Sequence, residues 1–266
     1  TLLYLSGVTF FTLGFGDVVP LTAPGRVVAV FEVATGFSFL ALIIGYLPTI
    51  YGAFSRREVN ITLLDARAGS PPSAAELLRR HHRADDLAAL DQLLREWERW
   101  AAELLESHLS YPVLSYYRSQ HEHLSWLASL TVILDTCTLL LVGVRCPEGD
   151  YPTRQARLTF AVARHALTDL NQILAAAPRP PVPDRLPSAD LTQLRDSLAE
   201  VGLQLRAGAD AEHGLAETRR LYEPYAHALA TSLLFTLPAW LPSNNADDWQ
   251  TTAWDWQPAL LPARDE

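Results

Sequence analysis

Residues 12–17 lie between two apolar segments. Their types and spacing indicate a function carried out by backbone groups and not by side chains. The apolar stretch before them, residues 2–12, reaches about 15 Å as a helix, which is half of a bilayer core. A helix of that length leaves backbone polar groups at membrane depth, where they are tolerated only if buried in protein or lining a watery cavity. We therefore predict a re-entrant element formed by Thr12-Leu13-Gly14-Phe15-Gly16-Asp17.

The second apolar segment is long enough to cross a membrane. Residues 27–54 form a run of 28 residues whose only charge is Glu32, and about 20 residues suffice for a spanning helix. Arg56 and Arg57 follow the run and mark its cytoplasmic flank. A buried helix of a soluble protein is the alternative, and the length of the run argues against it.

The six residues resemble the selectivity filter of the potassium channels, whose pattern is Thr-Val/Ile-Gly-Tyr/Phe-Gly-Asp. The resemblance covers residues 1–57 and implies that backbone carbonyls from four chains replace the water around K⁺, the permeant ion. Such a filter needs alternating backbone handedness, and glycine adopts the left-handed conformation at little cost. One motif per chain then implies a homotetramer in the lipid bilayer. The implied filter residues are Thr12, Leu13, Gly14, Phe15 and Gly16.

Two filter positions depart from the commoner pattern of the family. Phe15 stands where tyrosine is commoner, so no phenol hydroxyl is available to tie the filter to the pore helix. Leu13 replaces a β-branched residue where the filter backbone is extended. A weakly selective cation channel is therefore the alternative within this class. Asp17 matches the family position that hydrogen-bonds back to the pore helix, and Tyr4 stands where an aromatic partner is expected.

The start of the long apolar run resembles the inner, pore-lining helix of simple bacterial channels. Gly36 is either the hinge glycine of that family or a packing glycine at a helix contact. Glu32 is the one ionisable residue at membrane depth and lies on nearly the same helix face as Gly36. For Glu32 we favour a protonated carboxyl behind the filter over an acidic ring in the cavity. Pro48 either kinks the gate region or marks a helix end beside the headgroups.

Residues 58–266 have the composition of a helical, water-facing domain. They carry 18 Arg and 28 acidic residues, against 3 Arg and 2 acidic residues in residues 1–57. The formal net charge of -9 excludes a general nucleic-acid binder. Hydrophobic spacing and capping residues predict an all-α domain with helices over 73–107, 112–144, 153–176, 188–206 and 211–235, and a Pro-rich linker over 178–187.

One predicted helix of this domain lies either in a membrane or in the core of a soluble bundle. Residues 127–144 are apolar apart from Asp135, so a second membrane crossing is an alternative. We favour a buried helix of a soluble bundle, because Asp135 lies near the centre of the run among threonines. The tail tryptophans, Trp240, Trp249, Trp254 and Trp256, are expected in docked loops.

The helical domain offers little side-chain chemistry. No nucleophile, base and orienting group converge on a motif, so we expect neither an enzyme nor a cofactor. The polar and aromatic stretch 108–121 is interpreted as a packing seam between helices, with a ligand or contact surface as the alternative. The histidine pairs do not share a helix face, so we expect no metal site, and the cysteines are predicted to be buried thiols. These residues are His81, His82, His121, His123, Cys137 and Cys146.

The sequence thus predicts a potassium-selective pore of the cell membrane, followed by a cytoplasmic helical domain that regulates or assembles it. A sensor domain for an unknown ligand or protein that gates the pore is the alternative for residues 58–266. The chain starts inside an apolar run, so we expect a further spanning helix before Thr1 and a multi-pass full-length protein.

Overall fold

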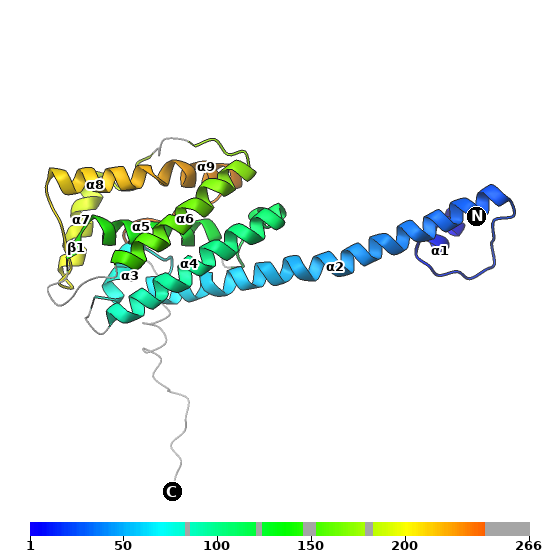
Figure 1. Ribbon diagram of the computed structural model, residues 1–266, viewed down its shortest axis with the longest axis horizontal. Coiled ribbons are helices and arrows are strands. Elements are labelled where there is room, and N and C mark those ends of the chain that lie inside the picture. Colours follow the sequence, from blue (N-terminus) through cyan, green and yellow to red (C-terminus); the bar gives the residue numbers. More distant parts are fainter. Residues whose placement is uncertain (83–85, 121–123, 146–152, 179–182, 243–266) are drawn as a thin grey trace, which may run out of the picture. The chain divides into compact units, whose positions relative to one another are not determined.

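The computed structural model describes residues 1–82, 86–120, 124–145, 153–178 and 183–242 (Figure 1). These residues are mostly helical with almost no strands, and the prediction of an all-α chain is confirmed. The chain forms two compact units, Thr1–Phe54 and Ser55–Glu266.

The first unit contains helix α1 and most of the apolar part of helix α2. Helix α1 is Leu2–Phe10, and α2 is Ala23–Ala68, which is long and apolar enough to cross a membrane. We expected the second helix to end near residue 54, whereas α2 continues through a charged stretch. It continues because Ile61, Leu64 and Ala68 recur at helical spacing and are fully buried in the core of the second unit.

The second unit is a helical bundle built around a buried helix. Helix α4 (Leu87–Ser110) packs against α6 (Thr153–Ile173), and α6 packs in turn against α5 (Trp126–Val142) (Figure 1). Residues 126–140 of α5 are all buried, so in this fold the apolar run is the core of a bundle. The remaining elements are α3 (Ala74–Arg80), η2 (Pro112–Tyr116), α7 (Ser188–Ala199), α8 (Ala209–Arg220) and α9 (Glu223–Leu233).

Two very short strands accompany the helices. Strand β1 (Val144–Arg145) and strand β2 (Gln204–Leu205) pair antiparallel, with Val144 opposite Leu205. The pair follows the end of α5 at Gly143, whose φ of 132° is accessible to glycine and unfavourable for other residues.

The predicted helix over 73–107 is wrong, because the structure has two helices there. Ser73 is the N-cap of α3, as its type suggests, and accepts the N–H of Glu76 at 3.3 Å. Helix α3 ends at Arg80 because the next two side chains take up carbonyls of its last turns. His81 Nδ1 lies 2.8 Å from the Leu77 oxygen, and His82 Nδ1 lies 2.6 Å from that of Arg79.

The predicted helix over 112–144 is also wrong in its first part. Residues 112–116 form the 3-10 helix η2, and α5 begins only after Ser125, which accepts the N–H of Ala128 at 3.0 Å. Carbonyls of η2 also accept hydrogen bonds from the side chains of Arg57 and Trp126 elsewhere in the unit.

Two further predicted helices end earlier than expected or divide. Helix α7 stops at Ala199, where Gly202 has a φ of 82° and Leu203 N–H donates to the Leu198 carbonyl at 2.9 Å, as in a Schellman cap. The helix predicted over 211–235 divides into α8 and α9, with Pro224 in the first turn of α9.

Other expectations about the domain have separate outcomes. Trp240 is docked, with an exposed fraction of 1%, and the Cys137 thiol is buried. Within the predicted linker over 178–187, Pro183, Asp184 and Pro187 are exposed, whereas Leu186 and the side chain of Arg185 are buried. Several predicted features lie outside the described residues, namely His121, His123, Cys146, linker residues 179–182 and the tryptophans at 249, 254 and 256.

Candidate functional site

The segment after α1 is tied back to that helix by its own backbone. Leu13 N–H donates to the Val8 carbonyl at 2.9 Å, and Gly14 N–H reaches the same oxygen at 3.4 Å. Helix α1 has no glycine or proline at its end, and the left-handed Thr12 together with these bonds turns the chain out of the helix, as in a Schellman cap.

The backbone of residues 12–16 alternates in handedness. The φ angle is positive at Thr12 (58°), Gly14 (60°) and Gly16 (79°), and the residues between them are not left-handed. Such alternation turns successive carbonyl groups toward one side of the segment. This is the backbone geometry that a ring of carbonyl ligands requires.

Thr12 is the strained member of this segment. A β-branched residue in the left-handed region is a true outlier and costs about 1–3 kcal/mol, which persists mainly where function requires it. The sequence indicated left-handed positions only at the two glycines. Nothing in the type of residue 12 predicts its conformation, since threonine disfavours it.

Residues 12–16 are open in the single chain. The exposed fractions of the Leu13 and Phe15 side chains are 59% and 68%. Among the described residues, no hydrogen bond reaches the carbonyl oxygens of residues 12–16. The segment thus presents bare backbone acceptors between two apolar helices.

A hydrogen bond braces the far end of the segment against α1. Tyr4 Oη donates to Asp17 Oδ2 at 2.9 Å, across 13 positions of the chain. Tyr4 lies in the first turn of α1, so this bond and the bonds to Val8 hold residues 12–17 at both ends.

The N-terminal part of α2 packs on α1 through two of the residues singled out in the sequence. Ser6 Oγ donates to Glu32 Oε1, so the carboxyl faces the pore helix. One turn later, Gly36 lies under the last turn of α1: a Cβ there would come within 2.0 Å of the Phe10 carbonyl oxygen. Gly36 is therefore a close-packing glycine in this structure, whether or not it also bends.

Pro48 lies inside α2 and does not end it. The helix continues to Ala68. The interpretation of Pro48 as a helix end is therefore wrong. Proline lacks the backbone N–H of one helical hydrogen bond, and the residues after Pro48 remain helical.

Arg57, which we expected to flank the membrane span, is buried in the second unit. Its side chain is 4% exposed and donates to the carbonyls of Leu114 at 2.9 Å and Tyr117 at 2.8 Å. It also lies 3.4 Å from His108 Nε2. The stretch 108–121 thus contains a polar packing seam, as the sequence suggested, and Arg57 is the residue that the sequence gave no reason to place there.

The seam fixes the charge of His108. Burial and the neighbouring Arg57 guanidinium lower the pKa of His108 to about 4. The ring is therefore neutral at physiological pH, with Nδ1–H donating to the Leu104 carbonyl at 2.7 Å and Nε2 facing Arg57.

The buried aspartate of α5 has charged partners from the C-terminal part of the unit. Arg185 binds Asp135 through two nitrogens, at 2.5 and 3.2 Å, and Glu223 at 3.2 Å. Burial alone would lower the pKa of Arg185, but the charge of Asp135 outweighs it and raises that pKa. Tyr222 Oη also donates to Asp135 at 2.5 Å, so the buried carboxyl has hydrogen-bond partners on both oxygens inside the bundle.

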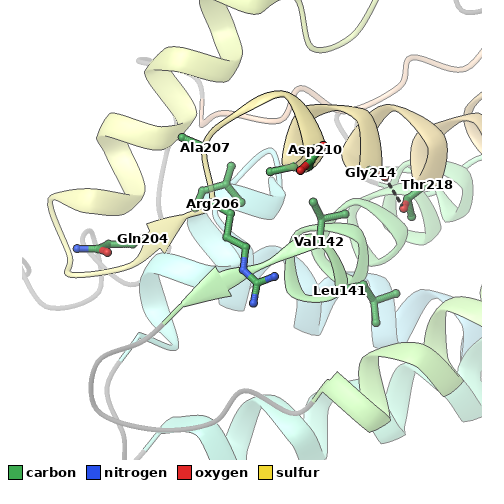
Figure 2. Close-up of a pocket in the computed structure, with 10 residues that line it drawn as sticks. Leu141, Val142, Gln204, Arg206, Ala207, Asp210, Gly214 and Thr218 are labelled. Carbon is green, nitrogen blue, oxygen red and sulfur yellow. Dashed lines mark hydrogen bonds between the residues drawn. The ribbon is translucent and has the colours of Figure 1, made fainter.

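A hollow of the second unit lies where α5 ends beside α8. Its volume is about 750 Å³, within the range of small-molecule sites. Figure 2 shows Leu141 and Val142 at the end of α5, and Asp210, Gly214 and Thr218 along α8. The Arg206 side chain leaves the end of β2 and crosses Gly143, where a Cβ would meet its Cδ at 2.5 Å. The sequence contained no motif that indicated this pocket.

No cluster of three or more potential metal ligands occurs in the part of the chain that the structure describes. His81 and His82 instead bond to backbone carbonyls of α3.

The arrangement of a short helix, an alternating backbone segment and a long apolar helix is that of a membrane channel domain. Residues 1–51 match the ion channel family. The chain is also similar to the uncharacterized membrane protein YdjJ of Bacillus subtilis (strain 168), with 23% identity over 195 residues. That match covers 73% of this chain and 55% of the relative, so the chain spans about half of the relative's length. No solved structure matches the chain.

Residues 1–51 are thus similar to ion channel domains, and a larger part of the chain is similar to a membrane protein. The similarity to the Bacillus protein is longer than the channel domain, so it includes part of the helical unit.

Proposed function

We propose that residues 1–57 form the pore of a potassium-selective channel. The observation that carries the proposal is the positive φ at Thr12, Gly14 and Gly16 within a segment held at both ends on α1. The carbonyls of residues 12–15 and the Thr12 hydroxyl replace the hydration shell of K⁺ in this proposal.

Four copies of the chain form the pore. One chain supplies one filter segment, and a ring around the ion needs several, so a homotetramer with closed symmetry is the assembly we propose. The apolar side chains of α2 support it: Val28, Phe37 and Leu42 are more than half exposed in the single chain and suit lipid or neighbouring copies.

A weakly selective cation channel is the second candidate, favoured by one specific feature. Phe15 offers no hydroxyl to its surroundings, so the filter is braced at its outer end by the bond between Tyr4 and Asp17. If that bond does not hold the carbonyls at a fixed spacing, Na⁺ is not excluded.

We propose that the cytoplasmic helical unit regulates or assembles the pore. Support comes from α2, which is one helix from the apolar span into the core of that unit. A ligand sensor is the sharper form of this role, with the pocket between α5 and α8 as its candidate site. Changed open probability after removal of residues 58–266 would support regulation, and an unchanged value would leave assembly.

The filter assignment is tested by a matched pair of glycine substitutions in the full-length protein reconstituted into vesicles. Gly14→Ala places a side chain at a φ of 60° and distorts the carbonyl ring, so we expect K⁺ flux to fall at least about tenfold. Gly7→Ala is the control, because Gly7 is in α1 and a Cβ there meets nothing within 4 Å. Equal flux in the two variants would refute the assignment.

A further inference from the structure

The carboxyl of Glu32 is bound by the short helix that leads into the filter segment. Glu32 lies near the start of α2, is partly buried, and accepts a hydrogen bond from the hydroxyl of Ser6 in α1. We infer that Glu32 is a positioning residue of the pore, which holds α1 through Ser6 and so sets the spacing of the carbonyl ring that separates K⁺ from Na⁺. The inference rests on the pore function proposed above and adds a determinant of its selectivity.

A carboxyl at this place is unfavourable for a helix that only has to cross a membrane. Glu32 is the only charged residue of the apolar run 27–54. An ionisable residue at membrane depth is costly, and it usually faces the protein interior and has a specific partner there. Ser6, 26 positions away in the chain, is that partner in the structure. The cost of Glu32 is therefore set against a contact with α1 and not against a contact with lipid.

The hydroxyl of Ser6 is used differently from those in the apolar part of α2. Thr35, Ser38 and Thr49 each donate to the carbonyl four positions earlier in their own helix, at 2.8, 2.7 and 3.0 Å. Such bonds satisfy the hydroxyl within one helix and contribute nothing to the packing of two. Because Ser6 donates to Glu32 instead, its hydroxyl joins the two helices of the first unit.

Two contacts hold α1 on one face of α2. Glu32 binds Ser6, and Gly36 lies so close to α1 that a Cβ there would come within 2.0 Å of the Phe10 carbonyl oxygen. Glu32 and Gly36 are four positions apart, so both lie on the same face of their helix. A single close contact allows α1 to turn about it, whereas a second contact one turn away prevents that motion. The bond to Ser6 is thus the contact that stops α1 from turning about Phe10.

The orientation of α1 reaches the filter segment through Val8. Val8 is midway between Ser6 and Phe10, and its carbonyl accepts the N–H of Leu13 at 2.9 Å and that of Gly14 at 3.4 Å. A rotation of α1 therefore moves the first carbonyls of the segment. Selection of K⁺ over the smaller Na⁺ depends on the size of the carbonyl ring and on the number of its oxygens. Loss of the Ser6 bond is therefore expected to relax the ring and admit Na⁺.

The test compares the ion selectivity of variants of the full-length protein in planar bilayers, with K⁺ on one side and Na⁺ on the other. Glu32→Leu removes the acceptor, and Ser6→Ala removes the donor. Glu32→Gln keeps a side-chain oxygen that can accept the Ser6 hydroxyl. Ser38→Ala is the control, because the Ser38 hydroxyl donates to the Ala34 carbonyl of its own helix.

We expect Glu32→Leu and Ser6→Ala each to lower the permeability ratio of K⁺ to Na⁺ roughly tenfold, the effect of one hydrogen bond to a carboxyl. The double variant should lower the ratio no further, because both changes remove the same bond. Glu32→Gln should keep most of the wild-type ratio, and Ser38→Ala all of it. If Glu32→Leu does not assemble on size-exclusion chromatography, Ser6→Ala carries the test.

Three results would overturn the inference. A ratio in Ser6→Ala equal to that in Ser38→Ala would show that Ser6 has no part in selectivity. Equal losses in Glu32→Gln and Glu32→Leu would show that the pore uses the charge of the carboxyl and not its bond to Ser6. Additive losses in the double variant would show that the two residues act separately. A wild-type reversal potential near zero is a different failure, because it would refute the potassium pore itself and the inference with it.

Discussion

One hydrogen bond at the outer end of the filter segment decides how firmly that segment is held. In the structure Tyr4 Oη reaches Asp17 Oδ2 at 2.9 Å, and Phe15 has no hydroxyl to add a second bond. This bond joins the first turn of α1 to the last residue of the segment. We therefore regard the pair as the main brace of the outer filter.

Removing this bond should make the filter collapse more readily. We expect Tyr4→Phe to accelerate the decay of macroscopic current roughly fivefold, and Phe15→Tyr, which supplies a hydroxyl, to slow it. Current decay in planar bilayers after activation measures both. Tyr51→Phe changes another exposed tyrosine of the same unit and should have no effect. A current that decays identically in all three variants would show that the brace has no role.

His108 makes a pH-dependent contribution to the stability of the helical unit. Its pKa of about 4 in the fold lies below its ordinary value of 6.5, because burial and Arg57 disfavour the charged ring. The unfolded chain therefore binds a proton between these pH values that the native chain does not, and stability falls as the pH falls from about 6.5 toward 4. The expected loss is about 3 kcal/mol.

The comparison is with His108→Gln, which cannot titrate. We expect the apparent unfolding temperature of the detergent-solubilised protein, followed by near-ultraviolet circular dichroism, to fall more steeply with acid in the wild type than in this variant. Parallel curves between pH 6.5 and 4 would contradict the assignment.

For single residues, the sequence predicted some backbone conformations and gave no signal for others. The glycines at 14 and 16 indicate left-handed positions because only glycine adopts them without cost, and both have positive φ. Thr12 has the same conformation against its own preference, so its type carries no signal. Arg57 was indistinguishable in sequence from Arg56, since burial depends on the Leu114 and Tyr117 carbonyls, which are about 60 positions away.

Between elements, the packing of α2 on α1 depends on the absence of a side chain at one position. A Cβ at Gly36 would come within 2.0 Å of the Phe10 carbonyl, so α1 would have to move, and the filter follows α1. We expect Gly36→Ala to abolish conduction and to lower the temperature at which the assembled protein dissociates. Gly45→Ala, in the same helix with nothing within 4 Å, should leave both unchanged.

This pair also distinguishes packing from bending. If Gly36→Ala lost conduction while the dissociation temperature stayed at the wild-type value, close packing would not be its role, and a hinge would explain the loss.

The presence of a helix was more predictable from the sequence than the residue at which it ends. Apolar spacing identified the helical segments. It did not predict where they end, because other groups bind their last carbonyls: His81 Nδ1 in α3, Arg57 in η2 and the backbone N–H of the left-handed Gly202 in α7. Periodicity does not report such competition. The pairing of Asp135 with Arg185 was likewise not predictable, because 50 positions separate them and no spacing rule relates them.

For the whole molecule, α2 is the feature that joins the proposed pore to the helical unit. It is 46 residues long, apolar at first and then buried on one face in the core of the second unit. We propose that this shared helix carries changes in the helical unit to the pore. This coupling regulates ion flow only if residues 1–57 form a conducting channel.

The most direct test of the whole account is therefore the reversal potential of the full-length protein in a planar bilayer, with K⁺ on one side and Na⁺ on the other. The account predicts a reversal close to the potassium limit, lost when Thr12 or Gly14 is substituted. A reversal near zero would contradict it, and would mean that the segment with Leu13 and Phe15 passes both ions.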